Sequence, residues 1–105
     1  MRIPKVFYLK GKKWCVEYKW GLRGCDDEKL DGQCIREDRI IQIERGLSKE
    51  EKWPVFLHEF IHASLFELHV TDLDGGVDGL LEEVICEGIG HILNDTFRFR
   101  WKRKK

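Results

Sequence analysis

The segment SKEEKWPVFLHEFIHASLFEL, residues 48–68, predicts the central helix of the molecule. In its first four residues, the Ser48 hydroxyl can accept a hydrogen bond from the backbone of Glu51, and the Glu51 side chain can return to Ser48, which is a capping box. Apolar residues then follow on nearly every side of the helix, so we expect it to be buried almost all round. Because Pro54 cannot donate to the carbonyl four residues earlier, we also expect a kink or a fresh helix start near Trp53.

Three polar residues, His58, Glu59 and His62, interrupt this apolar surface. Residues four apart return to nearly the same face of a helix, so both imidazoles can point at one metal ion. Glu59 is one step around the helix, where it can act as a general base, as in the HExxH arrangement of zinc peptidases. Burying such groups without partners costs several kcal/mol, which favours a Zn²⁺ site over two chance histidines in a core.

A catalytic zinc needs a third protein ligand and one open position. A second helix is predicted over residues 80–94, and placing its residues at 100° steps puts Glu87 beside the apolar stripe with His91 one turn later. Glu83 then points further outward and Glu82 lies on the other side, so we favour Glu87 as the third ligand, with Glu83 as the alternative. Gly88 and Gly90 predict a close approach between the two helices. The apolar stripe consists of Leu81, Ile85, Gly88, Ile89 and Ile92.

The first half of the chain has the alternating patterns and turn residues of short strands. Strands are predicted at residues 5–10, 13–20, 33–37 and 39–44, with a Gly- and Asp-rich loop at 21–32. We therefore expect an α+β fold, in which a small antiparallel sheet of three or four strands packs on two main helices. The length of 105 residues indicates a single domain spanning residues 1–105.

Composition bears on whether the chain binds nucleic acid, associates with a membrane or is secreted. Basic and acidic residues balance at 19 each, which argues against strong steering toward nucleic acid or a membrane. The chain has no long apolar run and no signal-peptide pattern, so we expect a cytoplasmic protein without membrane partners, whose four cysteines are reduced thiols. The basic tail, about residues 98–105, is more typical of a solubilising terminus than of a nucleic-acid contact, because no matching basic patch is evident elsewhere in the sequence.

HEFIH followed by a helix with a glutamate ligand resembles the gluzincin metallopeptidases. More narrowly, residues 33–95 resemble the small phage and prophage HExxH proteins related to SprT-like and ImmA/IrrE-type metallopeptidases, through the strand RIIQIE, the Ser-capped helix and the helix EEVICEGIGHIL. The resemblance implies a minimal zincin-like domain. It also implies a ligand glutamate followed four residues later by Asp or Asn, which orients a ligand histidine. Glu87 matches the ligand position, and His91, at the Asp or Asn position, is a candidate orienting residue, additional ligand or proton donor.

The sequence thus predicts a zinc-dependent metallopeptidase that hydrolyses a peptide or protein substrate with Glu59 as general base. Residues 39–44 would form the sheet edge to which an extended peptide adds. One alternative is a non-catalytic domain stabilised by a closed four-ligand zinc site that includes His91. Another is a nucleic-acid-associated module that uses the basic tail. Candidates for stabilising the oxyanion are Tyr8, Tyr18, Arg39 and His91.

Overall fold

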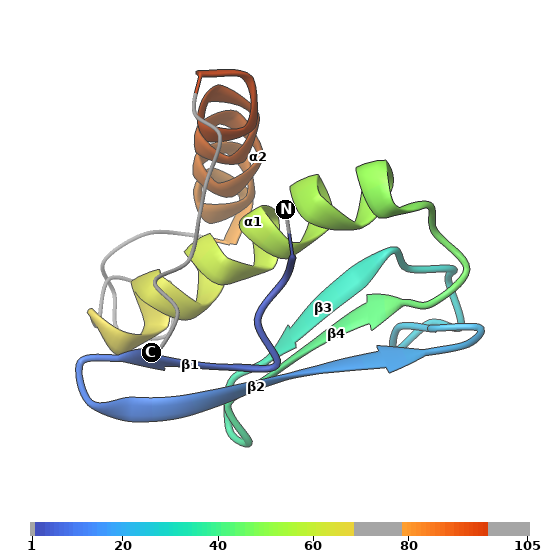
Figure 1. Cartoon of the computed structure of the whole chain (residues 1–105), viewed down its shortest axis with the longest axis horizontal. Helices are drawn as coiled ribbons and strands as arrows, with labels where there is room; N and C mark the ends of the chain where they lie inside the picture. Colours follow the sequence, from blue (N-terminus) through green and yellow to red (C-terminus); the bar gives the residue numbers. More distant parts are fainter. Residues whose placement is uncertain (1, 69–78, 97–105) are drawn as a thin grey trace.

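Four strands and two helices make up the described part of the chain, residues 2–68 and 79–96, in a computed structural model (Figure 1). This confirms the predicted α+β fold with a small sheet and two helices. The predicted basic tail lies outside the described residues, as do residues 69–78 between the two helices. The elements in chain order are β1 (Val6–Leu9), β2 (Lys12–Lys19), β3 (Gly32–Ile35), β4 (Ile40–Glu44), α1 (Lys49–Glu67) and α2 (Gly79–Thr96).

The sheet is mixed, with strand order β1-β2-β4-β3. β1 and β2 form an antiparallel hairpin whose turn residues Lys10 and Gly11 both have positive φ, 49° and 78°, which matches the twist of the strands. β4 pairs antiparallel with β3 but parallel with β2, so the expectation of a purely antiparallel sheet is wrong. The long loop after β2 explains the difference. It places β3 at the edge of the sheet, one strand position away from β2, and β4 then occupies the position between them.

A buried carboxylate fastens this loop to the end of β4. Glu44 accepts hydrogen bonds from the backbone N–H of Leu22, at 2.8 Å, and of Gly46, at 2.9 Å. These backbone N–H groups, that of Gly46 most strongly, hold the pKa of Glu44 below its usual range. Leu22 is itself buried, so the loop is tied down by an apolar side chain and by one charge-assisted hydrogen bond, while the bond from Gly46 holds the carboxylate in place.

The two faces of the sheet differ in polarity. Ile41 and Ile43 are fully buried under α1, together with Trp14 from β2 and Phe56 from α1. On the opposite face, side-chain hydrogen bonds run across three strands, from Gln33 to Gln42 at 2.6 Å and from Gln42 to Glu17 at 3.1 Å. This alternation is what the strand patterns predict for a sheet with one covered face.

α1 begins with the predicted capping box. The backbone N–H of Glu51 donates to the Ser48 hydroxyl, and the Glu51 carboxylate accepts from the backbone N–H of Ser48. The expected fresh helix start near Trp53 is absent, because the helix runs continuously through Pro54. The proline deprives only the carbonyl of Glu50 of its partner, and Glu50 is exposed in the first turn, where water can bind that carbonyl.

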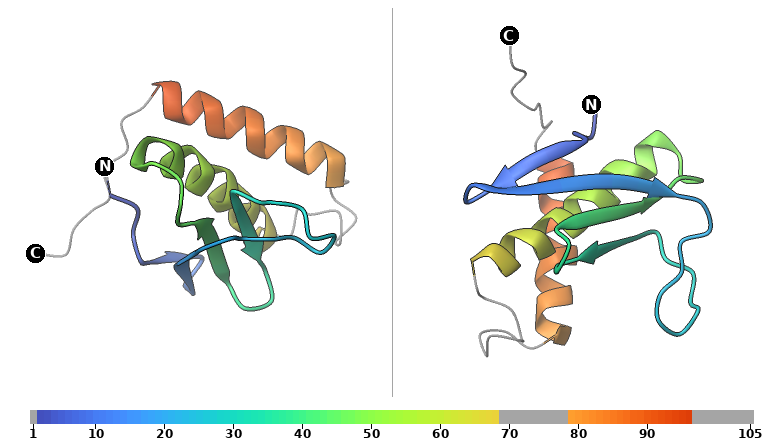
Figure 2. Two further views of the ribbon diagram at one scale, coloured as in Figure 1. Left: turned by 90° about the vertical axis from the view of Figure 1, so that its right-hand side faces the viewer. Right: turned by 90° about the horizontal axis from the view of Figure 1, so that it is seen from below.

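α2 packs across the face of α1 that points away from the sheet, so α1 is the middle of three layers (Figure 2). Gly90 is buried there, and a Cβ added to it would lie 3.7 Å from the backbone nitrogen of His58, which fits the predicted close approach of the helices. Gly88, in contrast, is exposed, and no contact within 4 Å of a Cβ added there is made with another element in the described part of the chain. Neither helix in the described residues is long and apolar enough to cross a membrane.

The predicted orientation of the second helix about its own axis is wrong. Glu82 and Cys86 are buried against α1, whereas Ile92, a member of the apolar stripe, is 61% exposed and Ile89 is 43% exposed. Leaving one such side chain in water loses the stabilising free energy of its burial, about 1.5–3 kcal/mol. Burying an imidazole with no partner costs a comparable amount or more, and the observed orientation supplies partners to both histidines of α1.

The contact between β3 and α1 requires a residue without a side chain at position 32. A Cβ on Gly32 would lie 2.5 Å from Val55 Cγ1 and 3.2 Å from the backbone oxygen of Gln42. Gly32→Ala should therefore destabilise the protein by about 1–3 kcal/mol, the usual range for overpacking. In a Val55→Ala background the same change should cost clearly less, because Cγ1 is gone. Urea unfolding of the four variants measures both costs, and equal costs in the two backgrounds would contradict this packing.

Candidate metal centre

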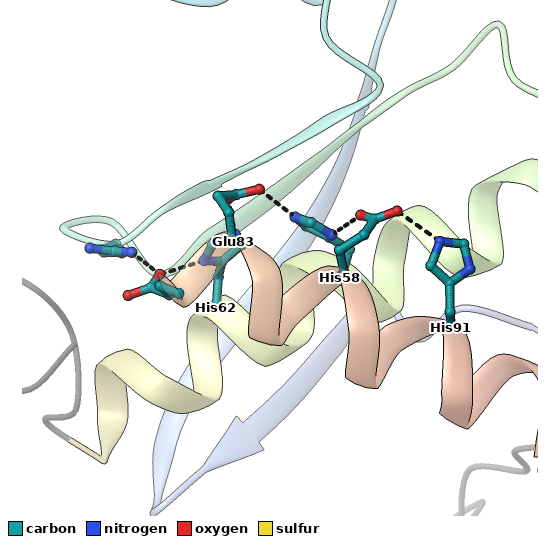
Figure 3. A network of polar contacts seen from close by, with 7 residues as sticks. His58, His62, Glu83 and His91 are labelled. Atoms are coloured by element: carbon teal, nitrogen blue, oxygen red, sulfur yellow. Dashed lines mark hydrogen bonds and ion pairs between the residues drawn. The ribbon is translucent and has the colours of Figure 1, made fainter. Parts of the chain in front are cut away.

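His58 and His62 lie on the face of α1 that meets α2, with ring centroids 5.0 Å apart. Their Nε2 atoms converge on one carboxylate of α2, that of Glu83 (Figure 3). The distances are 3.3 Å from His58 Nε2 to Oε2 and 2.5 Å from His62 Nε2 to Oε1. Ligand atoms of the three residues all lie within 4.8 Å of one another, which is a group able to surround a metal ion.

The other ring nitrogen of each imidazole, Nδ1, contacts a further carboxylate of α2, a different one for each histidine. The distance from His62 Nδ1 to Glu82 is 2.5 Å, and that from His58 Nδ1 to Glu87 is 2.9 Å. A carboxylate accepts the Nδ1 proton and so fixes the tautomer that leaves the Nε2 lone pair free for a metal. The three glutamates of α2 therefore divide into one that faces both Nε2 atoms and two that orient the rings.

Glu82 belongs to a buried chain of charges that links the sheet to both helices. Its side chain is 2% exposed, and its Oε2 accepts both from His62 and from the guanidinium of Arg36 in the turn between β3 and β4. A carboxylate this deeply buried must be compensated, and Arg36 supplies the charge. The turn between β3 and β4 is thereby connected to the position of His62.

Glu59 is buried beside the two imidazoles, and its carboxylate has no hydrogen-bond partner among the described residues. Burial raises its pKa, and the nearby Glu83 raises it further, whereas His58 and His62 act in the opposite direction. A carboxylate whose proton affinity is raised inside a cavity suits a general base better than an ordinary surface glutamate does.

Glu59 and His58 border two hollows of the surface, of ≈ 390 Å³ and ≈ 260 Å³. Both are bounded on the sheet side by Gly32 of β3, and the larger one also by Cys34. The prediction that residues 39–44 form the sheet edge beside the site is wrong, because β4 lies between β2 and β3. β3 is the edge strand on the side of the sheet away from β1, and its residues border the site.

The register of β3 decides which of its backbone groups are open. The backbone N–H of Glu44 donates to the Asp31 carbonyl at 2.8 Å, so Asp31 and, by alternation, Gln33 direct their backbone groups toward β4. Gly32 and Cys34 then direct their N–H and C=O groups away from the sheet. This is an open edge of the kind to which an extended chain can pair.

His91 is 62% exposed, and its Nε2 contacts Glu87 at 2.7 Å, so it does not join the group around the two Nε2 atoms. It does border the smaller hollow, unlike the other candidates for oxyanion stabilisation. Tyr8 is exposed on β1, Tyr18 lines a different pocket, and Arg39 is paired with Glu67 at 2.8 Å.

All four cysteines are free, as expected for reduced thiols. One of them, Cys86, forms a second cluster of potential ligands with His62 and Glu82, in which all three residues are buried. The guanidinium of Arg36 already contacts Glu82 there, and its charge opposes a cation at that point. Burial raises the pKa of the Cys86 thiol to about 12, so a thiolate ligand is also costly to form. The group around the two Nε2 atoms is therefore the better position for a metal.

Sequence reasoning named His58, Glu59 and His62, and Glu83 as the alternative third ligand, but it missed the contact of Glu82 with His62. A usable signal was the pair of acidic residues one turn before Cys86 and Glu87, since residues four apart share a face.

Two imidazoles and a carboxylate are ligands that zinc takes in catalytic sites, so the donor set fits this metal. No protein-family model, no curated protein and no solved structure matches the chain. The assignment of a function therefore rests on the geometry of this site.

The buried pair of Arg36 and Glu82 can be tested through stability. Arg36→Met should destabilise the metal-free protein by about 3 kcal/mol, because a buried carboxylate loses its main cation. In a Glu82→Gln background the same change should cost less than half as much, since no charge is left to compensate. Urea unfolding in EDTA measures both, with Lys12→Met, an exposed lysine on β2, as the matched control. Equal costs in the two backgrounds would disprove the coupling.

Proposed function

We propose that this chain is a zinc-dependent peptidase whose metal is held by His58, His62 and Glu83. The observation that carries the proposal is the shared geometry of the two imidazoles: both Nε2 atoms face one carboxylate, and both Nδ1 atoms are held by others. Rings oriented in this way have lost the freedom that would otherwise weaken metal binding. Two histidines merely buried in a core would need only one partner each.

The sequence predicts Glu87 as the third ligand, and this prediction has not been tested by metal binding. From the contacts of the two histidines, we propose Glu83 as the ligand in place of Glu87. Glu87 contacts the Nδ1 of His58, on the side of the ring opposite Nε2, which suits an orienting residue. Glu83 and Glu87 are four residues apart, as are the ligand glutamate and its orienting acid in the metallopeptidases that the sequence resembles. If Glu83 is matched to the ligand glutamate of those metallopeptidases, Glu87 falls at their Asp or Asn position. Position 91 then lies outside the pattern, so a histidine there does not conflict with it.

A bound zinc ion supplies Lewis acidity, which polarises a peptide carbonyl and eases deprotonation of water. The remaining chemistry belongs to Glu59, which is buried next to the ligands and faces the hollows. Its carboxylate takes the proton of the attacking water as the new C–O bond forms. It then gives that proton to the amine nitrogen as the C–N bond breaks, so the same group serves as base and acid.

The proposed substrate is an extended peptide or protein segment lying along β3. The outward N–H and C=O groups of Gly32 and Cys34 would pair with the backbone of the substrate, which is strand addition at a sheet edge. This pairing would place a peptide bond of the substrate in the hollow bordered by Glu59 and both histidines. Main-chain pairing gives affinity without demanding a particular sequence.

The alternative is a zinc-stabilised domain without catalysis. A small domain gains stability from a metal, but such a structural site is closed by four protein ligands. Among residues 2–68 and 79–96, the group around the two Nε2 atoms contains three ligand residues, and His91 contacts Glu87 instead. This favours an open position and hence the peptidase. A cytoplasmic location is part of the proposal, because four free thiols suit a reducing compartment.

Zinc binding separates the two candidate third ligands. The purified chain should bind one zinc ion, and Glu83→Ala should weaken binding by more than ~1,000-fold, since a direct ligand is lost. Glu87→Ala should weaken it by ~10–100-fold, as expected for a residue that only orients a ligand. Competition with a chromophoric chelator measures all three affinities. If Glu87→Ala has the larger effect, Glu87 is the ligand after all, and if the wild-type chain binds no zinc, the proposed function fails.

Hydrolysis separates the peptidase from the structural-zinc alternative. The zinc-loaded protein should cleave fluorescein-labelled casein, and Glu59→Gln should keep the zinc while lowering the rate at least ~100-fold, because the residue is a base rather than a ligand. Glu50→Gln, an exposed position in the same helix, is the matched control and should keep the wild-type rate. A zinc-loaded wild type that cleaves neither casein nor a random peptide library would support the structural-zinc alternative.

A further inference from the structure

A third pocket, of ≈ 540 Å³, lies where the end of β2 and the residue after β4 meet the first turns of α1. It shares no lining residue with the two hollows beside His58. The sequence gives no hint of it, because its residues come from four separate segments of the chain. They are Arg2, Ile3, Tyr18, Arg45, Lys49, Lys52 and Trp53.

The described residues that line this pocket are basic or uncharged and none of them is acidic, although the chain as a whole carries 19 basic and 19 acidic residues. None of its four cationic side chains forms an ion pair within the described part of the chain. The nearby Glu51 is engaged by the backbone of Ser48, and the start of α1 adds its own partial positive charge. Four cations gathered without a counter-charge repel one another, and a bound anion would relieve that repulsion.

Aromatic rings lie among these cations. The guanidinium carbon of Arg45 is 5.8 Å, and the Nζ of Lys52 5.4 Å, from the centroid of the Tyr18 ring. Trp53 lines the pocket and is stacked on Phe56, with centroids 5.6 Å apart, which fixes the plane of its indole. Trp20 lies beside Gly46, the residue after Arg45, and is 74% exposed, so a large apolar surface is left in water there.

Cations interleaved with aromatic rings are the chemistry that recognises a nucleotide, because phosphate needs positive charge and a base needs a flat apolar surface. An acidic peptide would use the cations and leave the rings without a role. We propose that this pocket and the exposed Trp20 beside it bind a nucleotide unit, with phosphate on Arg45, Lys49 and Lys52 and the base against Trp20. The volume of the pocket is within the usual ~300–1,000 Å³ of small-ligand sites. The unit is either a free nucleotide or one residue of a single strand, and both present the same groups.

This proposal is independent of the peptidase, since it uses none of the metal-centre residues. It is tested on the full chain by fluorescence anisotropy with a labelled 12-residue oligothymidylate. The double variant Lys49→Gln with Lys52→Gln should weaken binding at least ~fivefold and make the salt dependence less steep by ~0.7 for each lost phosphate contact. The matched control is Lys12→Gln with Lys13→Gln, two exposed lysines of β2, which should bind as the wild type does. An abasic strand of the same length should bind more weakly, because the stacking is gone.

Thymidine monophosphate added as a competitor distinguishes the two sources of the nucleotide unit. Displacement at micromolar concentration would identify a free nucleotide as the ligand, and displacement only by longer strands would identify a single strand. The proposal is overturned if both double variants bind alike, which would assign the binding to the basic residues 98–105. It is also overturned if polyglutamate displaces the strand as well as DNA does, or if no binding occurs in 50 mM salt.

Discussion

The burial of α1 between the sheet and α2 is the constraint on which the other features depend. A helix covered on both sides has little room for polar side chains, yet His62 and Glu67 are both buried in it. Each must therefore be paired within the protein, and the partners come from elsewhere in the chain. Glu82 of α2 binds His62, and Arg39 of the turn between β3 and β4 binds Glu67. These pairings set where α2 and that turn can lie, because an unpaired buried charge costs more than most rearrangements of surface side chains.

Local signals account for what could be predicted from the sequence. The capping box at Ser48, the apolar run of α1 and the alternating patterns of the strands act within a few residues, and the elements appear where these patterns occur. Strand order is different, because alternation indicates which side chains face the core but not which strand is the neighbour. The insertion of β4 between β2 and β3 depends on the loop of residues 20–31, whose anchor is the bond from Leu22 to Glu44 across 22 positions. No local pattern contains that information.

The candidate site shows the same division between local and distant causes. The histidines and Glu59 could be named because HExxH is a local motif, whereas the choice among the candidate third ligands depends on how α2 is rotated about its axis. Reasoning from the apolar stripe assumed that Ile92 and its neighbours face the core, and this is usually sound for an amphipathic helix. Here the two imidazoles need polar partners, and Glu82 and Glu83 face α1 together with Glu87, which the sequence had placed on that side. Buried Gly90 lets the helix axes approach closely enough for these short contacts.

The continuity of α1 through Pro54 also fixes the distance between the candidate metal centre and the basic pocket. Lys49 and His58 are nine residues apart on one unbroken helix, which corresponds to about 13 Å along the axis. Both sites are therefore fixed to a single rigid element, and a ligand in the basic pocket would be held at a set distance from a peptide on β3. That distance exceeds the screening length of ~8 Å at physiological ionic strength, so the charges of one site have little direct effect on the other. Any advantage of having both sites would come from geometry, since a nucleotide-bearing target held at one site would present its peptide at the other.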